Sequence, residues 1–218
     1  MDFHQFRISN CPPNVYYIPD FLTSQEESYI LSMVERTPKP RWTQLAHRRL
    51  INYGGVPHPK GMIAEEIPTW LANYVDRVNQ LQPNVFESDR KANHVLINEY
   101  QPGQGIMPHL DGPLFYPTIT TISCGSHTVL QFEDQSDERR PVAKLLVEPR
   151  SLLILKDDMY HKYLHSIAET DTDAVDGSLN NLKHCEGVQL GDVLPRKTRI
   201  SLTIRHVPKT TKMKLKLF

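Results

Sequence analysis

The sequence predicts a mainly β protein of the α+β class, in which a β-sandwich or jelly roll carries helices on one side. Two amphipathic helical patterns occur early in the chain, and from His94 onward the sequence changes to short β-type runs separated by glycine, proline and charged clusters. Many short strands between turn signals are typical of sandwiches and jelly rolls. The length of 218 residues fits a single domain of this kind.

The two helices are expected near residues 23 and 68. Thr23 and Glu26 form a capping-box pattern that precedes an apolar stripe of Ile30, Leu31 and Val34. Pro68 is a favourable first-turn residue for the second helix. Its stripe consists of Trp70, Leu71, Tyr74, Val75 and Val78. Stripes of this kind usually belong to the core, so neither helix is assigned a function.

Seven β-type runs are expected to form strands, and two other segments are expected to form surface loops. The runs cover residues 94–100, 118–123, 129–132, 145–147, 151–155, 160–167 and 199–207. Residues 133–141 and 169–192 are rich in charged and turn-forming residues, which is typical of loops. Whether the second loop covers a functional site stays open.

The composition argues against several classes of protein but does not indicate what the protein binds. Lysine plus arginine and aspartate plus glutamate both number 25, so the overall charge does not indicate an anionic partner. The three cysteines lack metal-ligand spacing, which argues against a disulfide scaffold or a structural zinc site and favours a reducing compartment. With no signal pattern and no membrane-spanning apolar run, we expect a soluble protein of the cytoplasm or nucleus that does not contact membranes.

The pair His109 and Asp111 is the first indication of chemistry. Alternate side chains of a strand point the same way, so a His-x-Asp pair in a β-rich segment places an imidazole and a carboxylate on one face. A second histidine would complete the 2-His-1-carboxylate triad that binds Fe(II) and leaves coordination positions open. The pair alone is weak evidence, because most such pairs are ordinary surface residues.

Two histidines could supply the third ligand. His161 and His165 have the same strand parity, so alternation does not distinguish them. His165 lies between the apolar residues Leu164 and Ile167, as expected of a buried ligand, whereas His161 follows a turn-like stretch. We therefore favour His165 and keep His161 as the alternative.

Residues 199–205 alternate between two chemically different faces. Ile200, Leu202 and Ile204 form one face, and Arg199, Ser201, Thr203 and Arg205 form the other. Two buried arginines need an anionic partner; the alternative is a strand whose polar face lies in solvent. Because six residues span about 20 Å, we expect Arg199 to form the direct bidentate pair with a small dicarboxylate and Arg205 to have a lesser role.

Asn98 and Tyr100 share one face of the run 94–100, and a short turn leads from there to His109. An amide and a phenol are thereby expected close to the proposed metal. The alternative is that these polar groups hydrogen-bond each other or water.

Taken in order, four motifs resemble the AlkB family of Fe(II)- and 2-oxoglutarate-dependent dioxygenases. They are Asn98-x-Tyr100-x-Pro102-Gly103, His109-x-Asp111, His165-Ser166-Ile167 and Arg199-x-Ser201-x-Thr203-x-Arg205. Segments 42–45, 52–59 and 112–118 are similar to one subgroup in particular, the sixth of the AlkB homologues. The resemblance implies a double-stranded β-helix, a cupin-like jelly roll, with the N-terminal helices packed on one sheet.

The resemblance also implies roles for individual residues. His109, Asp111 and His165 would hold Fe(II). The far carboxylate of 2-oxoglutarate would pair with Arg199, assisted by Tyr100 and Ser201, while Asn98 and Arg205 would steady its nearer end. The family usually has asparagine where this chain has Ser201, and a hydroxyl reaches less far than an amide.

By the same resemblance, the chain would use molecular oxygen to demethylate an alkylated or methylated base of RNA or DNA, acting as a monomer. Residues 1–93 would hold the helices and the substrate-recognition region, residues 94–207 the β-helix, and residues 208–218 a basic tail. Candidate substrate contacts are Lys39, Arg41, Trp42, Arg48, Arg49, Tyr53, Phe115 and Tyr116.

Each of these contacts has a simpler alternative. Arg48 and Arg49 could form a solvated basic turn, and Trp42 could belong to the core. The tail lysines Lys209, Lys212, Lys214 and Lys216 could be a solvated end or a phosphate-contacting arm. Two other functions stay open: hydroxylation or demethylation of a protein side chain, and recognition of modified nucleic acid without turnover.

Overall fold

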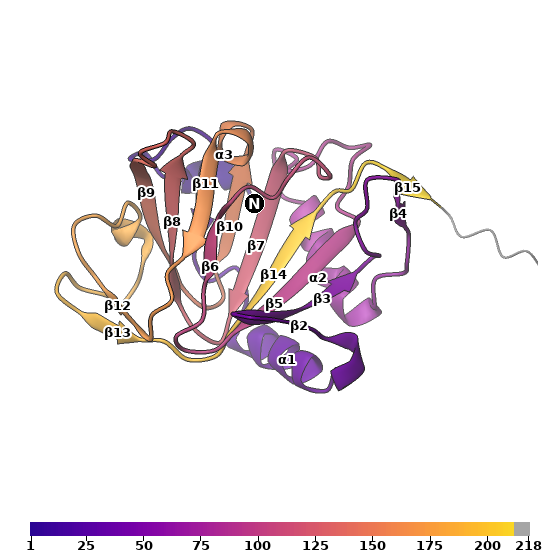
Figure 1. Cartoon of the computed structure of the whole chain (residues 1–218), viewed down its shortest axis with the longest axis horizontal. Helices are drawn as coiled ribbons and strands as arrows, with labels where there is room; N and C mark the ends of the chain where they lie inside the picture. The colour runs from indigo at the N-terminus through magenta and orange to yellow at the C-terminus, as the bar shows by residue number, and fades with distance from the viewer. Residues whose placement is uncertain (212–218) are drawn as a thin grey trace, which may run out of the picture.

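The computed structural model describes residues 1–211 and is a double-stranded β-helix made of two facing antiparallel sheets (Figure 1). The larger sheet has the order β1-β10-β7-β14-β5-β3-β2, and the smaller sheet has the order β6-β11-β8-β9. The seven strands of the larger sheet are β1 (Val15–Ile18), β2 (Thr43–Leu45), β3 (Arg48–Tyr53), β5 (His94–Tyr100), β7 (Thr118–Cys124), β10 (Leu152–Lys156) and β14 (Arg199–Arg205). The four strands of the smaller sheet are β6 (Ile106–His109), β8 (Thr128–Asp134), β9 (Pro141–Val147) and β11 (Tyr163–Ile167).

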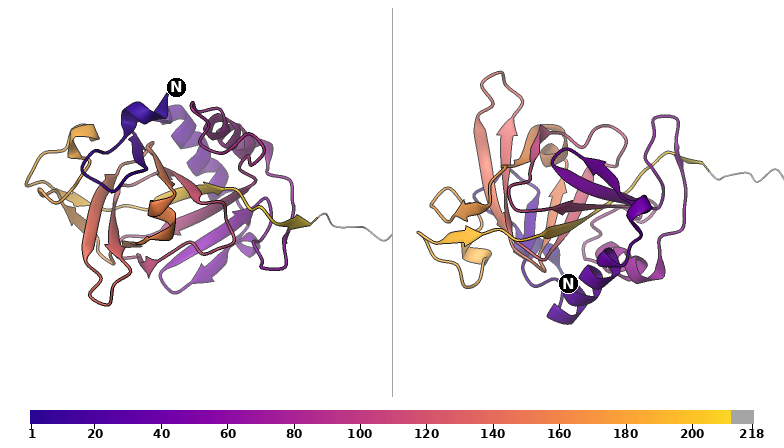
Figure 2. Two further views of the ribbon diagram at one scale, coloured as in Figure 1. Left: turned by 90° about the horizontal axis from the view of Figure 1, so that it is seen from above. Right: turned by 60° about the horizontal axis from the view of Figure 1, so that its bottom comes forward.

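Two helices cover the outer face of the larger sheet, as predicted. They are α1 (Ser24–Glu35) and α2 (Thr69–Asn79), which lie on the same side of the β-helix (Figure 2). Buried side chains of both helices join one core with the outward-facing residues of β5, β7, β10 and β14. The Thr23 hydroxyl accepts a hydrogen bond from the Glu26 N–H (3.2 Å), and the Glu26 carboxylate accepts one from the Thr23 N–H (2.7 Å). The predicted capping box is therefore present.

The remaining elements are short. A single helical turn, α3 (Asp158–His161), precedes β11. Two-stranded sheets are formed by β12 (Thr172–Ala174) with β13 (Val193–Pro195) and by β4 (Met62–Ile63) with β15 (Thr210–Thr211). Three 3-10 helices are η1 (Phe3–Phe6), η2 (Lys39–Arg41) and η3 (Leu182–His184).

Most expected strands are present, and the differences between predicted and observed strand bounds have physical causes. The run 94–100 coincides with β5, but the run 160–167 was wrong at its start, because residues 158–161 form α3. The loop predicted at residues 133–141 is shorter than expected, since β8 continues to Asp134 and β9 begins at Pro141. The strands β1, β2, β3 and β6 were not predicted. β2 and β3 form a hairpin with several charged and polar residues, whereas β1 and β6 are short and pair with strands distant in sequence.

The segment 169–192 is more ordered than the predicted loop. It contains β12 and η3, and its residues Val175 and Leu179 pack against Val129 and Leu146. Val129 of β8 and Leu146 of β9 face away from the space between the sheets, because the next residues of their strands, Leu130 and Val147, line the cavity there. The segment therefore covers the outer face of the smaller sheet.

The start of the predicted tail belongs to the small β4–β15 sheet. The Lys209 ammonium donates a hydrogen bond to the Pro59 carbonyl (3.0 Å). Lys212, Lys214 and Lys216 lie outside the described residues, so their proposed contact with phosphates stays a prediction. Among residues 1–211, no helix has the length and apolar character needed to cross a membrane.

Candidate active site

A cavity of about 230 Å³ lies between the two sheets. Its apolar wall comes from both sheets and from α3, and includes Ile119, Leu130, Val147, Leu153, Leu155 and Met159. A second apolar core fills the space between the sheets beside β1. Seven of the eight predicted site residues line the cavity: Asn98, Tyr100, His109, Asp111, His165, Arg199 and Ser201. The eighth, Arg205, contacts the cavity residue Asp111.

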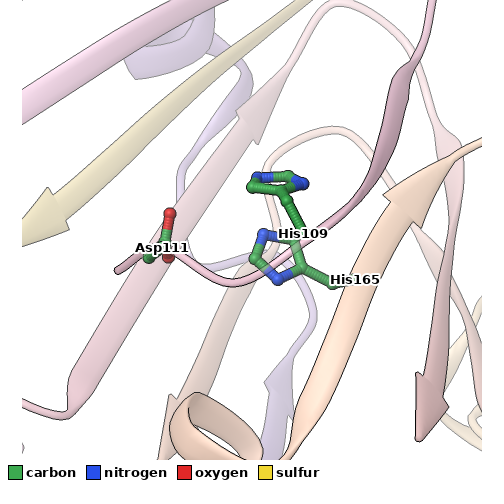
Figure 3. Close-up of side chains that lie close together, drawn as sticks. All are labelled: His109, Asp111 and His165. Carbon is green, nitrogen blue, oxygen red and sulfur yellow. The ribbon is translucent and has the colours of Figure 1, made fainter. Parts of the chain in front are cut away.

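His109, Asp111 and His165 converge at one side of this cavity (Figure 3). His109 of β6 lies directly opposite His165 of β11, and their ring centroids are 4.3 Å apart. One ligand atom from each of the three residues lies within 4.8 Å of the others, which is close enough to hold one metal ion. His161, the alternative ligand, is exposed at the end of α3 and is not part of this group.

Asp111 reaches this group by a different route from the one predicted. The strand β6 ends at His109, so Asp111 lies in the following coil and strand alternation does not orient it. Its Oδ1 atom instead accepts a hydrogen bond from Arg205 Nη1 (3.1 Å). The guanidinium of Arg205 also lies 3.8 Å from the centroid of the Phe115 ring. The carboxylate is therefore held by tertiary contacts.

The surroundings of the two imidazoles suit metal binding. Burial lowers the pKa of His165 to about 4, so its ring is neutral at physiological pH. Nδ1 of His109 lies 2.8 Å from the Met107 carbonyl oxygen, which requires an N–H at that position. The other ring nitrogen of His109 is thereby left as the metal-binding atom.

The floor of the cavity is formed by β14 and its two neighbours, β5 and β7. In the register, Arg199 is opposite Tyr100 and Ser201 is opposite Asn98. Arg199, Ser201 and Thr203 face the cavity, whereas Ile200, Leu202 and Ile204 join the core under the helices. The predicted division of this strand into two faces is confirmed.

Arg199 is a buried cation with no carboxylate partner among the described residues. Only 6% of its surface is exposed. Its Nη2 atom donates to the Ser123 hydroxyl (2.8 Å), while its Nε atom has no partner. Burial lowers the pKa of Arg199 to about 10, which still leaves it charged at neutral pH. An unpaired buried charge is costly, so this end of the cavity is suited to a carboxylate ligand.

Two polar residues at or next to the cavity, Ser123 and Tyr160, were not predicted. The Ser123 hydroxyl accepts the hydrogen bond from Arg199, and its parity with Ile119 and Thr121 in β7 could have indicated this position. Tyr160 of α3 lines the cavity. Burial, with a further contribution from the negative charge of Asp111, raises the pKa of Tyr160, so its phenol remains a hydrogen-bond donor.

The two adjacent arginines of β3 have different surroundings. Arg48 lines the cavity, and its Nε atom donates to Asn98 Oδ1 (3.2 Å). Arg49 points to the other face, where it forms a bidentate pair with Glu99 and stacks on Trp42 at 4.1 Å. Successive residues of a strand face opposite sides, so Arg48 and Arg49 do not lie together in a solvated turn, and of the two Arg48 alone reaches the cavity.

The other candidate substrate contacts also lie in different surroundings. Tyr53 is buried in the core, and Trp42 packs against the same core. The Tyr116 hydroxyl donates to Glu87 (2.8 Å). Lys39 and Arg41 are exposed. Of this group, Arg48 alone lines the cavity within the described residues.

Comparisons with known proteins agree with this geometry. Residues 33–205 match the model of the 2OG-Fe(II) oxygenase superfamily. The chain is 49% identical over 225 residues to "Probable RNA/DNA demethylase ALKBH6" of Danio rerio, covering 99% of this chain and 94% of that protein. It is 26% identical to a tRNA (carboxymethyluridine(34)-5-O)-methyltransferase, ALKBH8 of Macaca fascicularis, covering 94% of this chain but 32% of that protein.

A solved structure supports the fold assignment. The structure of OsALKBH1 superposes with a TM-score of 0.58 at 14% identity, covering 88% of this chain and 98% of that chain. At this identity, the similarity concerns the fold. The expected double-stranded β-helix is therefore confirmed.

Proposed function

The chain belongs to the 2OG-Fe(II) oxygenase superfamily, and from this premise we propose that it oxidatively demethylates a modified base of RNA or DNA. It is a dioxygenase that uses Fe(II) and 2-oxoglutarate. One arrangement carries the proposal: a 2-His-1-carboxylate group lines the same cavity as Arg199, a buried arginine that has no carboxylate partner within residues 1–211. The choice of substrate is supported by the zebrafish relative, which is described as a probable RNA/DNA demethylase.

The donor set of the cavity fits the proposed metal. Two imidazoles and one carboxylate suit Fe(II) and leave positions open for other ligands. We assign His109, Asp111 and His165 as the metal ligands, and Arg205 as the group that orients Asp111 through its 3.1 Å hydrogen bond. When bound, the iron and its co-substrate supply the oxidation of a C–H bond by molecular oxygen. Oxidation of an N-methyl carbon releases formaldehyde and leaves the demethylated nitrogen.

The floor residues are assigned to 2-oxoglutarate. Arg199 would bind the far carboxylate with its planar fork, with Tyr100 and Ser201 beside it. Asn98 would donate to the nearer carboxylate. Because Arg48 donates to Asn98 Oδ1, the amide N–H groups of Asn98 are left available for this anion.

The substrate base would enter the cavity after leaving its strand. The apolar wall would limit the access of water to the reacting carbon. Arg48 would place a cation at the cavity, while the exposed side chains of Lys39 and Arg41 would be available to phosphates. These assignments predict that binding weakens as salt concentration rises.

The proposal is tested by incubating the purified chain with Fe(II), 2-oxoglutarate and methylated RNA, DNA or peptides, followed by mass spectrometry of the polymers and quantification of succinate. We expect succinate, formaldehyde and loss of methyl groups from an oligonucleotide. Binding of methylated oligonucleotides without succinate would instead indicate a non-catalytic reader. Modification of peptides alone would indicate a protein oxygenase, and both results would contradict the proposal.

A further inference from the structure

Of the three proposed metal ligands, Asp111 has the least support from the backbone. His109 and His165 lie opposite each other in the β6–β11 ladder. Asp111 follows the end of β6, next to Gly112, which has a positive φ of 85°. A Cβ atom at Gly112 would have no neighbour within 4 Å, so the chain is not closely packed there. The backbone is next fixed at Tyr116, whose N–H donates to the His206 carbonyl (2.9 Å).

One phenol contacts the segment between these points. The Tyr160 hydroxyl donates to the Gly112 carbonyl and lies 3.3 Å from the Phe115 carbonyl oxygen. Tyr160 is 7% exposed, so these contacts are shielded from water. The helical turn α3, which carries Tyr160, is also attached to the end of this segment, because the Asp157 N–H donates to the Pro117 carbonyl (2.9 Å). Tyr160 therefore connects the segment after Asp111 with the segment that leads into β11 and His165.

The contacts of Arg205 complement those of Tyr160. Arg205 holds the carboxylate of Asp111 and stacks on Phe115, whereas Tyr160 holds the backbone of residues 112–115. The side chain and the main chain of this segment are thus fixed by two different residues. Partners of this kind tune a metal site through the orientation of its ligands.

We propose that Tyr160 is a positioning residue that holds Asp111 in place for the metal through the carbonyl groups of Gly112 and Phe115. The inference rests on the proposed role of Asp111 as a metal ligand. Tyr160 does not itself contact the metal; it acts by limiting the movement of the coil that carries Asp111. Loss of its hydroxyl should therefore weaken metal binding and change the ligand geometry while leaving the rest of the fold intact.

The test replaces Tyr160 with phenylalanine and titrates the metal-free chain with Co(II), whose absorption spectrum reports the ligand geometry. We expect the dissociation constant for Co(II) to rise about tenfold, with a changed spectrum. The matched control is Tyr163→Phe, because Tyr163 is half-buried on β11 beside the apolar core and should bind Co(II) as the parent does. An unchanged Tyr160→Phe titration would overturn the proposal, as would a Tyr160→Phe chain whose circular dichroism shows that it no longer folds without metal.

A double-mutant cycle shows whether Tyr160 acts through Asp111. In an Asp111→Asn background, the two histidines still offer a weak site, and adding Tyr160→Phe should not weaken Co(II) binding further. An equal loss in both backgrounds would contradict a role through Asp111. The unmutated chain distinguishes failure of the proposed function from failure of the Tyr160 proposal. If it shows no Co(II) spectrum that depends on Asp111, the proposed function fails. If it shows that spectrum and Tyr160→Phe binds Co(II) equally well, the role of Tyr160 alone is refuted.

Discussion

The floor and the rim of the cavity are built in different ways. The floor consists of β5, β14 and β7, which lie side by side within the larger sheet, and its residues Arg199 and Ser201 are almost fully buried. The rim consists of the short strand β6, the coil after it, β11, α3 and the hairpin β2–β3, and its metal-ligand candidates are half-buried. A continuous ladder orients the floor residues, whereas at the rim the pairing of β6 with β11 positions the two histidines and side-chain contacts position Asp111. Substitutions at the two places should therefore have separable effects.

The largest effect is expected when the rim loses a metal ligand. Asp111→Ala and His165→Ala should both reduce Fe(II) binding and bring succinate formation to the background level, because two remaining ligands hold a divalent ion poorly. Iron content and succinate are measured on the same preparations. His161→Ala is the matched control and should keep parent activity, since His161 is exposed on α3. Full turnover by either ligand variant at normal iron occupancy would refute the assignment.

The next effect concerns the floor alone. Arg199→Met should weaken 2-oxoglutarate binding by roughly a hundredfold, because truncating one partner of a buried ion pair costs about 2–5 kcal/mol. Arg199→Lys keeps the charge but loses the fork, so its loss should be smaller. Calorimetric titration of the Co(II)-loaded chains measures both. Co(II) affinity itself should stay unchanged, and a parallel loss of metal binding would show that the floor and the rim are not separable.

A smaller effect is expected where the hairpin meets the floor. Arg48→Ala should raise the KM for 2-oxoglutarate by about tenfold, the size expected for a lost hydrogen bond that orients a group binding an anion. It should also make the slope of log K for oligonucleotide binding against log salt concentration shallower by about one.

Arg49→Ala is the matched control for Arg48. It should leave both properties unchanged and lower the free energy of unfolding by about 1–2 kcal/mol, because Arg49 contacts Glu99 and Trp42 instead of the cavity. Equal behaviour of the two variants in the KM and salt assays would contradict the separation of their faces.

The effect that is smallest at neutral pH concerns His94, at the opposite end of β5 from Tyr100. Its Nε2 atom lies 3.0 Å from Asn52 Oδ1 of β3, and burial together with the charge of Arg205 lowers its pKa to about 3. Because the unfolded chain binds this proton near pH 6.5, the folded state loses stability as the pH falls from about 6.5 towards 3, by about 1.4 kcal/mol per pH unit.

His94→Gln should remove this contribution, which urea unfolding at several pH values measures. The free energy of unfolding of the parent should fall more steeply below pH 6.5 than that of the variant. Parallel curves for the two chains would contradict the lowered pKa, because they would show that His94 binds its proton over the same pH range in the folded and unfolded states.

The outcome at individual residues shows where local pattern was sufficient. The side chains of β14 alternate with a period of two residues, so the polar residues were correctly predicted to lie on one face of the strand and the apolar residues on the other. The capping box at Thr23 was likewise readable, because its hydrogen bonds join residues three apart. The same logic failed at Asp111, where the strand had already ended.

By itself, the sequence determined the fold class, the two faces of β14 and the types of side chain that a ferrous site and a dicarboxylate require. The tertiary structure alone decided that His165 rather than His161 joins His109, that Arg48 and Arg49 face opposite sides, and that Tyr160 and Arg205 hold the Asp111 segment. Alternation and helix capping are local and repeat along the chain. The contacts at the rim join residues that are tens of positions apart, and they follow from strand pairing and loop packing that no short pattern specifies.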